Sequence, residues 1–138
     1  MNRRDFIVGA VGCAGAFCAS GCAAVNPAPT VDAAADGSLA VPPELSQPGG
    51  QVKVRLPGAD ELVLVWRSDK GLGAASIECT HLGSEVHFNA AEGTLDCPSH
   101  GSRYAPDGKV QRGPAKRPLK PYVAAESGGR LTVKPAGP

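Results

Sequence analysis

The chain has 138 residues, of which only 4% are aromatic, and it contains 18 glycines and 13 prolines. A chain of this length and composition forms one small domain with appendages, rich in turns and with a modest core. Its formal net charge of +1 excludes the strong positive surplus that is typical of nucleic-acid-binding domains.

The first 24 residues have the three-part layout of an export signal. Paired Arg3 and Arg4 precede an apolar run from Phe6 to about Ala19, which ends in small residues. The stretch NRRDFI resembles a twin-arginine signal, which exports proteins that have already folded, and a protein that receives a metal cofactor in the cytoplasm would need that route. The alternative is a retained membrane anchor, although this run is rich in Gly, Ala and Cys rather than Leu.

Cys22 is a candidate for lipidation. The stretch ASGC that ends at Cys22 resembles a lipoprotein signal, except that Ala19 stands where a larger apolar residue is usual. The alternative is an ordinary residue near a plain signal-peptidase site. Export predicts a protein in the periplasm or on the outer face of the membrane, and a lipid or a retained anchor would hold it at the membrane.

Residues 25–50 predict a linker, because prolines stand among Ala, Gly and Asp without a sustained apolar period. From residue 51 to the C-terminus the pattern changes to short apolar runs separated by turn residues, which predicts strands. The expected strands are 51–56, 62–66, 74–79, 85–88, 94–96, 122–125 and 130–133. No helical period interrupts them, so we expect an all-β fold, a small antiparallel barrel or sandwich over residues 51–138.

Two short loops hold most of the metal-binding side chains of this domain. Cys79 and His81 follow one expected strand, and Cys97 and His100 follow another, with Gly or Pro beside each pair. Thiolate and imidazole groups bind iron and zinc well, and Gly and Pro let the backbone turn tightly toward a metal.

Three interpretations of these loops compete. A disulfide between Cys79 and Cys97 would leave both histidines at ligand spacing by chance. A structural zinc site would use two Cys and two His, but such motifs usually pair Cys with Cys and His with His. A two-iron cluster with mixed ligands fits better, because each loop then gives one ligand to each iron.

Residues 79–83 and 97–104 resemble the Rieske iron–sulfur family, whose loops read Cys-Thr-His-Leu-Gly and Cys-Pro-x-His-Gly-Ser. The resemblance extends over residues 51 to 134. It implies a [2Fe-2S] cluster in which Cys79 and Cys97 bind the inner iron and His81 and His100 bind the outer iron. His87 matches no ligand position and is expected to face solvent.

The resemblance also implies roles for residues around the cluster. Ser102 and Tyr104 match hydroxyl groups that donate hydrogen bonds to cluster sulfurs and raise the reduction potential. Gly113-Pro114-Ala115 resembles a loop that covers the cluster, and Leu82 would shield the irons. The segment 103–120 contains six basic residues, which form either a solvated rim or a docking surface for an acidic redox partner. These residues are Arg103, Lys109, Arg112, Lys116, Arg117 and Lys120.

Ser84 and Ser99 depart from the pattern of the quinol-oxidising members of the family. Those members have a cysteine at each position, and the two cysteines form a disulfide that clamps the ligand loops. Hydrogen bonds and packing must hold the loops here, and we expect the cluster to be lost to heat more readily than in disulfide-bearing relatives.

The sequence therefore predicts an exported, membrane-associated Rieske protein that passes single electrons. It would act as a carrier or as the small subunit of an oxidoreductase, without a substrate-oxidising site of its own. Candidate partners are a c-type cytochrome, the large subunit of an oxidase or a quinol-oxidising complex. The alternatives are the iron–sulfur subunit of a quinol–cytochrome c reductase and, in another class, a zinc-stabilised exported binding module.

Overall fold

A computed structural model describes residues 27–137 of the chain. The expected export signal, with the lipidation candidate Cys22, lies outside these residues. No helix among the described residues is both long and apolar enough to cross a membrane.

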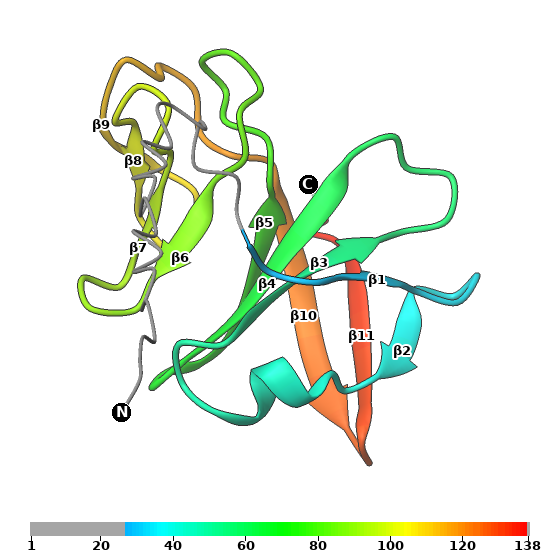
Figure 1. The fold of residues 1–138 in the computed structure, drawn as a ribbon. Coiled ribbons are helices and arrows are strands. Elements are labelled where there is room, and N and C mark those ends of the chain that lie inside the picture. The colour runs from blue at the N-terminus through cyan, green and yellow to red at the C-terminus, as the bar shows by residue number, and fades with distance from the viewer. Residues whose placement is uncertain (1–26, 138) are drawn as a thin grey trace, which may run out of the picture.

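The described chain forms two β-sheets (Figure 1). The larger sheet has the strand order β1-β3-β4-β5-β10-β11-β2, and the smaller sheet has the order β6-β7-β8-β9. Apart from the parallel pair β1 and β3, all pairings are antiparallel. The strands of the larger sheet are β1 (Thr30–Asp32), β2 (Ser38–Ala40), β3 (Gln51–Arg55), β4 (Leu62–Ser68), β5 (Gly71–Ser76), β10 (Pro121–Ser127) and β11 (Arg130–Pro135). The strands of the smaller sheet are β6 (His87–Asn89), β7 (Thr94–Asp96), β8 (Arg103–Tyr104) and β9 (Val110–Arg112). The expected all-β class is confirmed.

Strand β4 lies between two apolar clusters and contributes side chains to both. Successive side chains of a strand point to opposite faces of the sheet. Val63 and Val65 therefore pack into one apolar cluster with β3 and β11, while Leu64 and Trp66 pack into a second cluster with the smaller sheet. The rings of Trp66 and Phe88 stack across this junction with centroids 5.6 Å apart. Because both faces are covered, β4 reads as a continuous apolar run.

A pair of hydrogen bonds and an ion pair also join the two sheets. The side-chain amide of Gln51 on β3 donates to the carbonyl oxygen of Phe88 at 3.1 Å and accepts from its N–H at 2.9 Å. The Lys53 ammonium group lies 3.0 Å from the Glu85 carboxylate. These contacts fix the smaller sheet, which carries both ligand loops, against the larger one.

The expectation of a linker over 25–50 is wrong from Thr30 onward. This segment forms β1, β2 and the 3-10 helix η1 (Pro43–Ser46). Val31 pairs with Val54, Leu39 pairs with Leu131, and Leu45 is fully buried. The sequence hides these elements because three-residue strands offer only one or two inward side chains, which is too few to set up a visible period.

Other strands differ from the expected ones in their bounds, and two strands were not expected. The strand expected at 74–79 runs over Gly71–Ser76, and the strand expected at 85–88 runs over His87–Asn89, preceded by an isolated bridge between Glu78 and Glu85. Strands β8 and β9 were not expected, since β8 has two residues and the pairing between β8 and β9 is irregular. The strands at 51–55, 62–66, 94–96 and in the final hairpin are confirmed.

Asp96 is the polar centre of the smaller sheet. Its carboxylate accepts hydrogen bonds from Asn89 at 2.9 Å and Thr94 at 2.8 Å, and Arg103 binds it with two nitrogens at 2.9 and 3.2 Å. Arg103 also pairs with Glu92. Burial would raise the pKa of Asp96, but the hydrogen bonds from Asn89, Thr94 and Arg103 outweigh it and hold this pKa below 3.8. The network ties β6, β7 and β8 together.

We predict that Leu45→Ala lowers the free energy of unfolding by about 2–5 kcal/mol, because it removes a fully buried side chain from the segment first expected to be a linker. Leu82→Ala is the matched control, because Leu82 is 69% exposed, and its effect is expected to stay within about 0.5 kcal/mol. Chemical denaturation followed by the fluorescence of Trp66 measures both. Equal stability of the two variants would contradict a structural role for η1.

Asp96→Asn is predicted to lower the free energy of unfolding near neutral pH by about 1–3 kcal/mol, the usual worth of hydrogen bonds to a charged group. Since the pKa of Asp96 is lower in the folded than in the unfolded state, its stabilisation is present above about pH 4. That stabilisation disappears as the pH falls through the folded pKa. The gap between wild type and variant is therefore expected to close on acidification in denaturation curves.

The control for this prediction is Asp32→Asn, which removes one charge from an exposed ion pair with Arg55. Exposed pairs contribute little, so a change of no more than about 0.5 kcal/mol is expected. A gap between wild type and Asp96→Asn that stayed constant down to pH 2 would show that the carboxylate charge is not what stabilises the smaller sheet.

Candidate metal centre

The two ligand loops have the same backbone hydrogen-bond pattern. In the first loop the N–H of Cys79 donates to the carbonyl of Ser84, and the N–H of Gly83 donates to the carbonyl of Cys79, both at 2.8 Å. In the second loop Cys97 and Gly101 make the equivalent bonds, at 2.8 Å to Ser102 and at 3.0 Å to Cys97. Each loop therefore closes on itself and presents its side chains from a fixed hairpin.

The glycine in each loop is required by the backbone. Gly83 and Gly101 have φ angles of 78° and 81°, in the left-handed region that other residues rarely adopt. The shared pattern is Cys-x-x-x-Gly-Ser, which occurs at 79–84 and again at 97–102. This short repeat is present in the sequence itself and appears when the two motifs are aligned on their cysteines.

The loops bring together the four expected ligands as two pairs. Cys79 and Cys97 are buried, at 3% and 2% exposure, and both are free thiols. His81 and His100 face each other with ring centroids 4.9 Å apart and rings nearly perpendicular. His81 is half-buried and His100 is exposed. The thiol pair thus lies inside the protein and the imidazole pair reaches the surface. The alternative of a Cys79–Cys97 disulfide is wrong, because both thiols are free.

The two thiols differ in proton affinity. Burial would raise the pKa of Cys79, but hydrogen bonds from Tyr104, the His81 backbone and neighbouring side chains outweigh it and lower this pKa. Burial raises the pKa of Cys97, and the negative charge of Cys79 raises it further. A thiolate at Cys79 therefore disfavours a second thiolate beside it.

The residues present fit a two-iron cluster. The buried Nδ1 atom of His81 has no hydrogen-bond partner among residues 27–137, and a buried polar nitrogen without a partner is unfavourable unless a metal binds it. No three His, Cys, Asp or Glu side chains in this part of the chain gather around a single ion. The ligand candidates come instead as one sulfur pair and one imidazole pair, which a mixed-ligand [2Fe-2S] cluster requires.

Two buried hydroxyl groups point at the sulfur side of the site. The Tyr104 hydroxyl lies 3.2 Å from Cys79 Sγ and accepts the N–H of Thr80 at 3.1 Å. The Ser102 hydroxyl accepts the N–H of Ala115 at 3.0 Å, which leaves its own proton for donation. Burial raises the pKa of Tyr104, and the hydrogen bond to Cys79 raises it further, so this hydroxyl keeps its proton.

The segment 113–117 closes the site from the side. It is bonded to the second loop through Ala115 and Ser102, and to the first loop through the Thr80 hydroxyl, which donates to the Arg117 carbonyl at 2.7 Å. Leu82 is exposed beside His81, and Ser84 and Ser99 are not buried. His87 lies on β6 opposite Asp96 and is half-buried rather than fully exposed.

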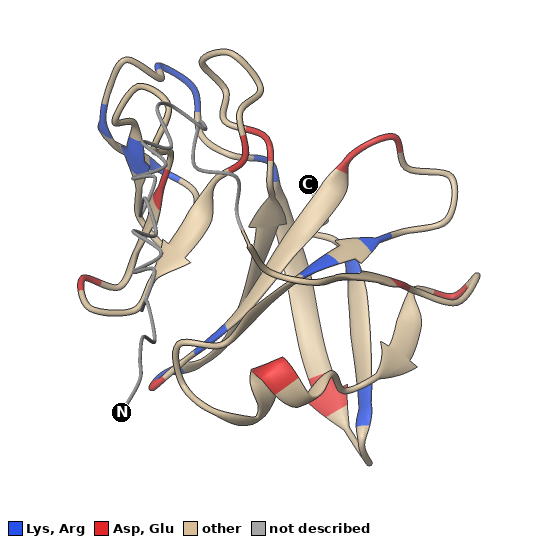
Figure 2. Ribbon diagram, in the orientation of Figure 1, with Lys and Arg blue, Asp and Glu red and all other residues tan. Residues whose placement is uncertain are grey.

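Half of the expected basic run has carboxylate partners. Arg103 binds Asp96 and Glu92, Lys109 lies 3.4 Å from Asp107, and Lys120 lies 2.7 Å from Glu61. The other half, Arg112, Lys116 and Arg117, is exposed and has no ion pair with any described carboxylate. Figure 2 shows these positive charges on the loop that connects β9 to β10 beside the ligand loops.

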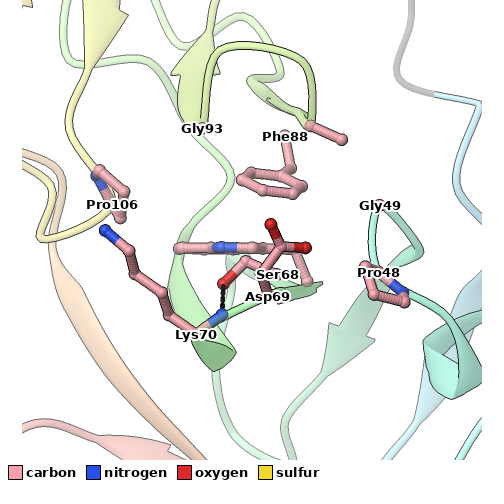
Figure 3. A pocket seen from close by; sticks show the side chains of 10 residues that line it. Pro48, Gly49, Ser68, Asp69, Lys70, Phe88, Gly93 and Pro106 are labelled. Atoms are coloured by element: carbon pink, nitrogen blue, oxygen red, sulfur yellow. Dashed lines mark hydrogen bonds between the residues drawn. The ribbon is translucent and has the colours of Figure 1, made fainter.

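A separate hollow of about 340 Å³ lies at the junction of the two sheets. Figure 3 shows Phe88, Lys70 and Pro106 at its wall. It shares no lining residue with the hollows beside His81, and none of the four ligand candidates lines it. Its chemistry is that of a packing gap between sheets rather than of the metal centre.

Comparison with known proteins places this site in a family. Residues 38–123 match the model of the Rieske [2Fe-2S] domain. The cytochrome b6-f complex iron-sulfur subunit of Chlorobaculum tepidum is 38% identical over 95 residues, which cover 69% of this chain and 52% of that protein. Subunit 2 of Trichormus variabilis is 33% identical over 142 residues, covering 87% of this chain and 77% of that protein. The chain spans about half the length of the first of these relatives.

Solved structures agree in fold. The plasma membrane Rieske protein of Synechocystis PCC 6803 has a TM-score of 0.54 and 36% identity, covering 62% of this chain and 86% of that one. The ferredoxin of carbazole 1,9a-dioxygenase from Nocardioides aromaticivorans has a TM-score of 0.60 at 24% identity, covering 72% of this chain and 98% of that one. The paired ligand loops and these matches agree: the chain belongs to the Rieske [2Fe-2S] domain family, whose domain binds a [2Fe-2S] cluster.

Proposed function

We propose that the chain is an exported, membrane-associated electron-transfer protein that carries one electron on a Rieske [2Fe-2S] cluster outside the cytoplasm. It acts as a carrier or as the small subunit of a respiratory oxidoreductase. The observation that carries the proposal is the division of the ligands, with both thiols buried and one imidazole at the surface.

In this proposal Cys79 and Cys97 hold the inner iron, and His81 and His100 hold the outer one. The cluster supplies reversible one-electron chemistry when bound. The exposed ring of His100 gives an electron a short path to a partner, while the buried cysteines keep water from the sulfur side. The hydrogen bonds of the two loops hold the ligand side chains in the same place in both oxidation states, which keeps reorganisation small.

Family membership favours the iron–sulfur cluster over the zinc-stabilised binding module. The iron–sulfur subunit of a quinol–cytochrome reductase remains the second candidate, because several relatives are named as iron-sulfur subunits of the cytochrome b6-f complex. In that case the partners are quinol and a c-type cytochrome. The export route, with a twin-arginine signal over residues 1–24 and membrane attachment through Cys22 or an anchor, is part of the proposal.

Electron paramagnetic resonance of the purified chain tests the proposal. We expect a mixed-ligand [2Fe-2S] signal that appears already on reduction with ascorbate, in the upper part of the roughly −150 to +300 mV range of Rieske centres. A signal that needs dithionite would contradict the high potential and point to a ferredoxin-like partner. No signal with either reductant, together with zinc in elemental analysis, would contradict the electron-transfer function.

Tyr104→Phe is predicted to lower the reduction potential. The hydroxyl group of Tyr104 donates toward Cys79, and a donor stabilises the extra negative charge of the reduced state. A differential contribution of about 1 kcal/mol corresponds to about 40 mV for one electron. Tyr122→Phe is the matched control, because the Tyr122 hydroxyl binds Glu61 in the larger sheet. Redox titration of both variants measures the effect, and equal shifts would contradict a local role for Tyr104.

A further inference from the structure

The loop from 112 to 117 carries three cations without an ion pair, whereas six of the nine other cations in residues 27–137 have one. Seven ion pairs bind Lys or Arg elsewhere in the described chain. The cations that remain without a carboxylate in residues 27–137 are Arg112, Lys116 and Arg117 on this loop, with Lys70, Arg130 and Lys134 outside it. Arg130 is bonded to the Ser38 hydroxyl. Half of the cations without an ion pair in residues 27–137 thus lie on this one loop.

This charge borders the exposed side of the metal centre. Lys116, Arg117 and His81 line one shallow hollow of about 420 Å³. Arg117 and His81 also line a neighbouring hollow of about 520 Å³, which Leu82 shares. Lys116 and Arg117 therefore lie beside an imidazole ligand candidate, where a partner must approach if electrons leave through the histidines.

Leu82 supplies an apolar contact at the same face. It is 69% exposed, and Val123 is the one other large apolar side chain described as exposed in residues 27–137. A single exposed leucine is ordinary by itself, and Leu82 matters here because it lines the same hollow as His81 and Arg117. A small apolar tip with a charged rim is the usual layout of a protein interface.

The larger of these two hollows also has acidic residues in its lining. Glu78 is exposed and without an ion pair in the described chain, and it lines the larger hollow with Leu82. Glu61 also lines this hollow, but Lys120, Ser76 and Tyr122 bind its carboxylate. Arg117 and Glu78 thus place opposite charges around the same hollow. Such a pattern sets the orientation of a docked partner as well as its attraction.

We propose that Leu82 and the cations Lys116 and Arg117 form a docking surface for a redox protein with carboxylates around an apolar depression. The inference rests on the proposed electron-transfer function and adds the chemistry of the partner. Unpaired rim charges raise the association rate without making the complex tight, since exposed charges are screened by salt. A protein that exchanges single electrons needs such brief encounters.

The test uses the full chain with its cluster and two soluble c-type cytochromes, one of net negative and one of net positive charge. The site variant is Lys116→Glu with Arg117→Glu. The matched control is Lys70→Glu with Lys134→Glu, which changes net charge equally but lies away from the face; Lys70 lines the hollow of Figure 3. Stopped-flow mixing of the reduced protein with each oxidised cytochrome gives the second-order rate constant.

At low ionic strength we expect the site variant to react with the negative cytochrome at least about tenfold more slowly than wild type, and the control less than about twofold more slowly. The difference is expected to vanish at high salt. Leu82→Ser is expected to stay slow at high salt, because an apolar contact is not screened. Equal losses in the site variant and the control would overturn the proposal, as would a faster reaction with the positive cytochrome in wild type.

A second readout does not depend on electron transfer. A zero-length carbodiimide joins lysine amines to carboxylates, so peptide mapping is expected to find the negative cytochrome attached to Lys116 rather than to Lys70 or Lys134. Retention of the wild type, but not of the site variant, on phosphatidylglycerol vesicles, without a cross-link at Lys116, would overturn the proposal in favour of a lipid surface.

The failure of the proposed function has a different signature. If ferricyanide cannot reoxidise the reduced wild-type protein, the electron-transfer function fails, and the docking surface fails with it. If ferricyanide reoxidises wild type, site variant and control at the same rate but charge reversal changes no cytochrome reaction, the docking surface alone is overturned.

Discussion

The Tyr104 hydroxyl is the point where the two halves of the metal centre meet. It lies 3.2 Å from Cys79 Sγ and 3.1 Å from both the N–H and the hydroxyl of Thr80. Tyr104 belongs to β8, which follows the second ligand loop, whereas Cys79 and Thr80 belong to the first. One buried side chain therefore holds both loops at a fixed separation. A hydroxyl group suits this task because it accepts a hydrogen bond and donates one at the same time.

The larger framework keeps that hydroxyl group buried. Tyr104 and both cysteines belong to the same apolar cluster as Leu64 and Trp66 of β4. The larger sheet thus supplies the floor of the metal centre, although it gives none of the ligand candidates. A shift of the smaller sheet against β4 would expose the sulfur side to water and weaken every hydrogen bond to it. The Gln51–Phe88 bonds and the Trp66–Phe88 stack oppose such a shift.

The sequence predicts the site better than the periphery of the fold. Ligand loops are visible because chemistry limits the choice at Cys79, His81, Cys97 and His100, and because Gly83 and Gly101 are required by the backbone. Strand β4 is visible because both of its faces are buried. Strands β1 and β2 are not visible, since their few inward side chains make no period and the parallel pairing of β1 with β3 is non-local.

Contacts between residues that lie far apart in the sequence are the other feature of the structure that the sequence does not reveal. The sequence alone does not show that the Thr80 hydroxyl donates a hydrogen bond to the carbonyl of Arg117, 37 residues away. Nor does it show that the side-chain amide of Gln51 donates one to the carbonyl of Phe88. A count of basic residues in the sequence overstates the free positive charge for the same reason. The run from 103 to 120 reads as six cations, yet ion pairs made by the fold neutralise three of them and leave the other three unpaired on one loop.

Cys79 and Cys97 lie close enough that a negative charge on one opposes a negative charge on the other. Hydrogen bonds from Tyr104 and the backbone favour a thiolate at Cys79, and that negative charge opposes a second thiolate at Cys97. The loops alone therefore stabilise one negative charge well and two poorly. In the proposed function Cys79 and Cys97 would hold the inner iron, whose positive charge would favour the thiolate form of both sulfurs. The same hydrogen bonds that position the ligand candidates would then make the folded loops most favourable with the metal in place.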